Sequence, residues 1–92
     1  MSDRTAPALS KLDRLLPLLR GLSQSSARDQ LIGEAEALQR AVNAFHMEAI
    51  RFRMYSVDRL INAAGDSREV REAFEELRHA LESAGFHTRS HA

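Results

Sequence analysis

Apolar residues recur three and four positions apart from residue 31 to residue 64, and no proline interrupts this stretch. Such spacing is typical of an α-helix with one buried face. Ser26 favours a helix start just before the stretch, and Gly65 favours an end just after it. We therefore expect one long helix over residues 27–64, about 57 Å in length at 1.5 Å per residue.

Shorter helices are expected on either side of this long helix. The first covers about residues 7–21, and Pro17 predicts a kink or an early end because its ring clashes with the preceding turn. The last covers about residues 67–84. Gly85 predicts a Schellman ending in which Phe86 folds back onto that helix. The chain is thus predicted to be all-α, with three helices organised on one long central helix.

The apolar residues of the long helix form two stripes that lie about a third of a turn apart. The first stripe consists of Leu31, Ala35, Leu38, Val42, Phe45, Ala49 and Phe52. The second stripe consists of Met47, Ile50, Met54, Val57, Ile61 and Ala64. A solvated face is expected from Glu48, Arg51, Tyr55, Asp58, Arg59 and Asn62.

The second stripe is matched by the apolar face of the helix over residues 67–84. The turn between the two helices is short and favours an antiparallel hairpin. Such a hairpin places Val70 near Ile61 and Leu77 near Met54. The first helix is long enough to cover only the beginning of the first stripe.

The rest of the first stripe has no cover within the chain, and we expect it to bind a partner. This uncovered stripe, with its continuation along the helix, consists of Phe45, Ala49, Phe52, Ser56 and Leu60. We expect a homodimer in which two long helices pack antiparallel about a two-fold axis near Ala49, which would complete a helical bundle. An unidentified protein partner on the same surface is the alternative occupant.

Composition limits the class of protein. Thirteen basic residues balance thirteen acidic ones, which argues against a general nucleic-acid binder. The chain has no cysteine, which excludes disulfides and thiolate metal sites and fits the cytoplasmic location that we expect. No stretch is apolar enough to span a membrane, and no apolar core of a secretory signal is visible near the start.

The domain organisation and the source are inferred from the same composition. Lys11 is the only lysine among many arginines, which suggests a GC-rich bacterial gene. A chain of this length has room for one core, so we expect a single helical domain over residues 1–92. Its ends, residues 1–6 and 86–92, are expected to be flexible.

His46 is the residue with the most chemical potential. It is expected to lie between the two stripes near Arg53, and a histidine can act as a base, a metal ligand or a switch. We favour the interpretation that His46 borders the core. No metal-ligand spacing, phosphate-binding loop or catalytic motif is present, so no metal, cofactor or catalytic residue is expected.

The function predicted from these features is a non-catalytic helical protein–protein interaction module, such as an adaptor, a small accessory subunit or a regulator. The alternative is a small enzyme or ligand-binding protein that uses His46 with Arg53 or Arg40. The alternative requires His46 to open onto a concave pocket with a second polar group within hydrogen-bond reach.

Overall fold

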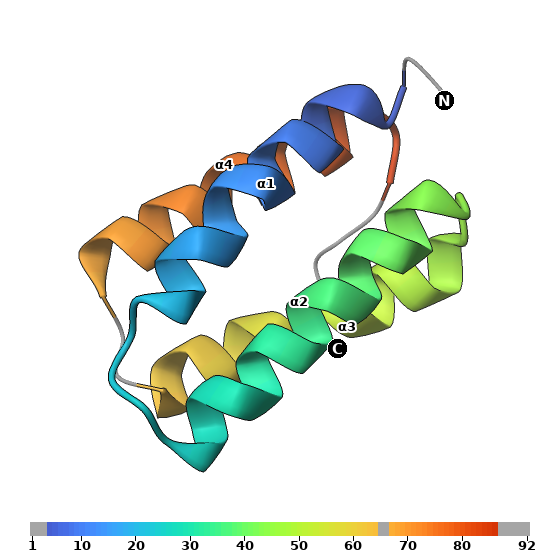
Figure 1. Ribbon diagram of the computed structural model, residues 1–92. Helices are drawn as coiled ribbons and strands as arrows, with labels where there is room; N and C mark the ends of the chain where they lie inside the picture. Colours follow the sequence, from blue (N-terminus) through green and yellow to red (C-terminus); the bar gives the residue numbers. More distant parts are fainter. Residues whose placement is uncertain (1–3, 65–66, 87–92) are drawn as a thin grey trace.

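The computed structural model describes residues 4–64 and 67–86, which form four α-helices and contain no strand (Figure 1). The helices are α1 (Ala6–Arg20), α2 (Ser26–Asn43), α3 (Met47–Ala63) and α4 (Arg68–Ser83). Successive helices run in opposite directions, so the chain forms an up-down-up-down bundle. Two pairs pack most closely along their backbones, α1 with α4 and α2 with α3. The predicted all-α class is confirmed.

The prediction of a single long helix over residues 27–64 is wrong, because the chain turns back at residues 44–46 and forms two helices there. α2 ends in a Schellman motif, in which His46 N–H donates to the Ala41 carbonyl and Phe45 N–H donates to the Val42 carbonyl. Phe45 adopts a left-handed conformation with φ of 59°. The His46 side chain then caps α3 by accepting a hydrogen bond from the Ala49 N–H at 3.1 Å.

Burial of both apolar stripes within one chain is the physical reason for this break. Folding α3 back onto α2 covers Leu38 and Val42 of the first stripe and Ile50 and Met54 of the second, all of which are fully buried. A continuous helix would separate these residues along its length and would leave much of their surface in water. The gain from burying apolar area outweighs the local preference for a continuous helix.

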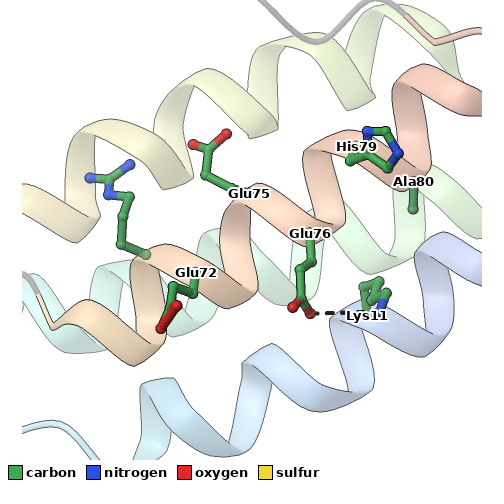
Figure 2. A pocket seen from close by; sticks show the side chains of 7 residues that line it. Lys11, Glu72, Glu75, Glu76, His79 and Ala80 are labelled. Carbon is green, nitrogen blue, oxygen red and sulfur yellow. Dashed lines mark ion pairs between the residues drawn. The ribbon is translucent and has the colours of Figure 1, made fainter.

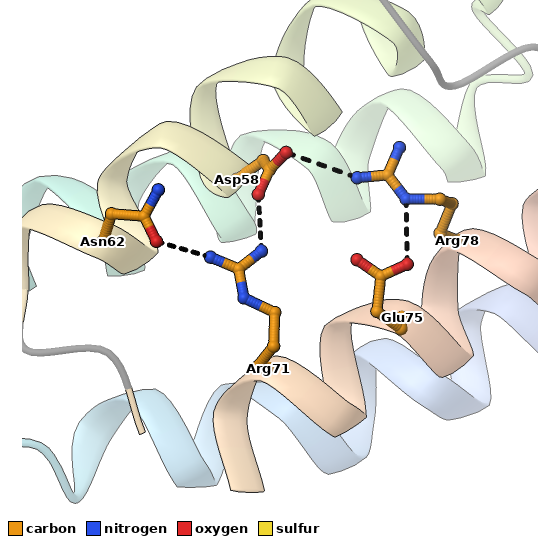
Figure 3. Close-up of polar contacts among 5 residues, drawn as sticks. All are labelled: Asp58, Asn62, Arg71, Glu75 and Arg78. Carbon is orange, nitrogen blue, oxygen red and sulfur yellow. Dashed lines mark hydrogen bonds and ion pairs between the residues drawn. The ribbon is translucent and has the colours of Figure 1, made fainter. Parts of the chain in front are cut away.

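The predicted antiparallel hairpin of the last two helices has the correct direction, but the two helices pack less closely than expected. α4 runs antiparallel to α3, yet its closest backbone packing is along α1 (Figure 1). Polar side chains join α3 to α4 (Figure 3). Asp58 accepts hydrogen bonds from Arg71 at 2.5 Å and from Arg78 at 3.4 Å, and Arg71 also donates to Asn62 at 2.8 Å.

One continuous core lies between the four helices. Its largest fully buried side chains are Phe74, Phe86, Leu12, Leu15, Leu19, Leu31, Leu38, Ile50, Met54, Ile61, Leu77 and Leu81. α1 contributes to this core along its whole length and continues past Pro17 to Arg20, so the early end considered for this helix does not occur.

The ends of the described chain are tied together. Gly85 follows α4 with φ of 97°, and the Phe86 N–H donates to the Leu81 carbonyl at 3.0 Å, which confirms the predicted Schellman ending. Arg4 donates to the Ala84 carbonyl at 2.6 Å, and Phe86 is buried. The remaining residues of the ends that were expected to be flexible, 1–3 and 87–92, lie outside the described residues.

Candidate interaction surface on α3

Large hydrophobic side chains are exposed at the α2–α3 turn and on the first half of α3. Their exposed fractions are 40% for Phe45, 45% for Met47, 58% for Phe52 and 50% for Tyr55. An exposed group of large apolar residues is typical of an interaction surface. The α2–α3 turn and the first half of α3 are therefore the candidate site.

The structure divides that expected stripe between the surface and the core. Phe52 is exposed, whereas Ser56 is 5% exposed and Ala49 and Leu60 are partly buried against the core. The division follows from the turn at residues 44–46, because folding α3 onto α2 turns one side of α3 inward. Of the five expected residues, only Phe52 and Phe45 present a large apolar side chain to solvent.

Phe45 is partly engaged within the chain. Its ring lies 5.1 Å from the ring of Phe86, with the planes tilted by 58°. The guanidinium of Arg4 lies 5.2 Å from the Phe45 ring and 5.8 Å from the Phe86 ring, within the range of a cation–π contact. Phe45 therefore links the α2–α3 turn to both ends of the described chain, while part of its ring stays exposed.

The outer face of α3 combines aromatic and charged side chains. Glu48, Arg51, Phe52 and Tyr55 line a small depression of about 220 Å³. Tyr55 was expected on a solvated face and Phe52 in an apolar stripe, yet the two lie on the same exposed side of α3. Their three-residue spacing signals this, because positions three apart share a helix face.

A second groove runs between α2 and α3, with a volume of about 480 Å³. Arg40 and Arg53 line it together with Ser56 and Leu60. Arg53 donates twice to the Glu34 carboxylate, at 2.9 and 2.8 Å. This ion pair neutralises the charge of one of the two guanidinium groups that line the groove.

His46 is not brought together with either arginine in this groove. Its side chain is exposed at the start of α3, and its Nδ1 atom accepts the hydrogen bond that caps the helix. An acceptor committed to a backbone N–H is not free to bind a metal or to take a proton from a substrate. The structure thus gives His46 a local role in the α2–α3 turn.

A third groove, of about 560 Å³, lies between α1 and α4 (Figure 2). Glu76 pairs there with Lys11 at 3.6 Å and also binds Arg14. The hydrogen bond from Arg14 lowers the pKa of Glu76, and the positive charge of Lys11 adds to this effect. His79 lies on the same side of α4, but among the described residues no three His, Asp or Glu side chains converge as a metal site would require.

No helix in the described part of the chain has the length and apolar character needed to cross a lipid bilayer. Comparison with protein-family profiles, with curated proteins and with solved structures finds no match.

Proposed function

We propose that this protein is a non-catalytic interaction module, such as an adaptor, a small accessory subunit or a regulator, that binds another protein chain through the outer face of α3. The observation that carries the proposal is the exposure of Phe52 and Tyr55, at 58% and 50%, on one side of a helix whose other side is buried. Isolated exposed apolar residues are common on proteins, whereas large apolar side chains that gather on one exposed face mark interaction sites.

The residue types around these rings support a protein partner. Aromatic residues, methionine and arginine are enriched in protein–protein interfaces. Met47, Arg51 and the two aromatic residues meet this description, and all of them are exposed. Tyr55 also carries a hydroxyl group that suits the edge of an interface, where one end of a side chain is buried and the other is exposed to solvent.

The alternative, an enzyme or ligand binder based on His46 with Arg53 or Arg40, has less support. The Nδ1 atom of His46 caps α3, and Arg53 forms its ion pair with Glu34. Both groups thus serve the fold, and His46 is not among the residues that line the groove that holds Arg40 and Arg53. We also propose a cytoplasmic location, as expected from the cysteine-free sequence.

A photo-crosslinking side chain placed at position 52 tests the proposal in cells that make the protein natively. We expect a covalent adduct with a protein chain from position 52, and none from a matched probe at Gln24, which is exposed in the α1–α2 connection. The adduct should disappear when Tyr55→Asp is introduced beside the probe, because a charge on the same face opposes burial. Equal crosslinking at both positions, or an adduct that survives Tyr55→Asp, would refute a specific surface on α3.

A further inference from the structure

Four exposed residues of α3 form a narrow stripe along its outer face, which we call the α3 seam: Glu48, Phe52, Tyr55 and Arg59. Their spacings are four, three and four residues. At 100° per residue the four positions fall within an arc of about 60°. Alternating spacings of three and four are those of the contact positions in a two-helix coiled coil.

The spacing and the residue types of the α3 seam are symmetric about its centre, apart from the sign of its end charges. An acidic residue stands at its start and a basic residue at its end, with two aromatic residues between them. An antiparallel copy aligned about a two-fold axis between Phe52 and Tyr55 places Glu48 against the partner's Arg59. The same axis places Phe52 against the partner's Tyr55, and each contact occurs twice.

In the part of the chain that the structure describes, the end charges of the α3 seam have no competing ion-pair partners. Within residues 4–64 and 67–86, neither Glu48 nor Arg59 forms an ion pair, whereas Arg53 and Asp58 of the same helix do. A parallel copy would set Glu48 against the partner's Glu48 and Arg59 against the partner's Arg59. Charge complementarity therefore selects the antiparallel arrangement.

We infer that a second copy of this chain binds the α3 seam, α3 against α3, antiparallel about a two-fold axis between Phe52 and Tyr55. This inference rests on the proposed function and names the partner of the same surface. It keeps the two-fold antiparallel dimer expected from the sequence but moves its axis to the exposed face of α3. A contact of one helix against one helix is small, so we expect a reversible dimer with a dissociation constant on the order of 10–100 μM.

Sedimentation equilibrium of the purified full chain, from about 5 to 500 μM, measures this association directly. We expect Arg59→Glu to weaken it at least about tenfold, because two Glu–Glu contacts replace two ion pairs. Glu48→Arg should weaken it equally. Glu72→Arg, an exposed charge reversal in the groove between α1 and α4, is the matched control and should leave association unchanged. Circular dichroism of each variant checks that the helices remain folded.

Mixing the two single variants gives the decisive measurement. A heterodimer of Arg59→Glu with Glu48→Arg restores both opposite-charge contacts, so the mixture should associate about as tightly as the original chain although each variant alone does not. A mixture that stays monomeric, or an original chain that is monomeric at about 500 μM, would overturn the inference. A monomer that nevertheless crosslinks to a different protein from position 52 would overturn the dimer and leave the proposed function standing.

Discussion

Phe45 and His46 hold the α2–α3 turn with side chains that seldom occupy such positions. The left-handed residue that follows a helix is usually glycine, and a side chain there costs about 1–2 kcal/mol. The Phe45 ring offsets this cost by packing against Phe86 and under the Arg4 guanidinium. His46 replaces the Ser, Thr, Asp or Asn that usually caps a helix, because its unprotonated Nδ1 can also accept a backbone N–H.

Substitution of Phe45 by glycine and by alanine tests the conformation of the turn. Both changes remove the ring, but only glycine relieves the left-handed strain. We expect Phe45→Ala to be less stable than Phe45→Gly by about 1 kcal/mol in urea unfolding, the reverse of the order in a helix interior. If Phe45→Ala proved the more stable variant, residue 45 would have to lie within a continuous helix.

Removal of the His46 side chain should weaken the start of α3. We expect His46→Ala to lower the free energy of unfolding by about 0.5–2 kcal/mol, whereas His46→Asp should retain most of the stability because a carboxylate is a strong cap. Amide hydrogen exchange at Ala49 reports the loss of the capping bond locally. Equal stability of the histidine, alanine and aspartate forms would mean that the cap contributes nothing.

Neighbouring helices of the bundle combine close packing and polar contacts to different extents. α2 and α3 pack closely through apolar side chains, and α3 meets α4 through the hydrogen bonds of Asp58 with Arg71 and Arg78 (Figure 3). α1 packs closely on α4, and Glu76 adds a polar link by pairing with Lys11 (Figure 2). Glu76 also binds Arg14. The polar links lie at the rim of the core and fix which faces of these helices meet.

The Glu76 link should make a small contribution to stability that depends on pH. Its folded-state pKa lies below the ordinary value because Arg14 donates a hydrogen bond to the carboxylate. The contribution is therefore fully present above the ordinary pKa and is lost as the pH falls through the folded-state pKa. We expect the melting temperatures of the original chain and Glu76→Gln to differ at pH 7 and to converge as the pH falls below the ordinary pKa of a glutamate. A difference that is independent of pH would show that the carboxylate charge is not involved.

At the scale of the whole molecule, the buried residues that stabilise the fold and the exposed residues proposed to bind a partner are different sets. The core joins all four helices, and α3 contributes to it with one side while its other side remains exposed. A chain of this size has little stability in reserve, so its buried side chains matter individually. Exposed aromatic residues, by contrast, contribute little to the folding of a monomer.

Truncation of core and surface residues should show this separation. We expect Leu77→Ala and Ile50→Ala, both at fully buried positions, to cost about 2–5 kcal/mol each. Phe52→Ala should change the unfolding free energy by less than about 0.5 kcal/mol when measured in dilute solution. Urea unfolding of the three variants tests both expectations, and a large loss in Phe52→Ala would mean that Phe52 belongs to the core rather than to a binding surface.

Local pattern was sufficient to predict the all-α class, the extents of the first and last helices to within a few residues, and the Schellman ending at Gly85. Glycine marks that ending because it alone adopts the left-handed conformation without strain. The same motif ends α2 with Phe45 in the glycine position, and no local signal distinguishes this from a continuing helix. Only packing distinguishes them, because the apolar periodicity of α2 and α3 is the same whether the two helices are joined or folded together. That fold also determines which of the predicted partner-binding residues face solvent, since side chains on opposite sides of α3 have similar spacing but only one side meets α2.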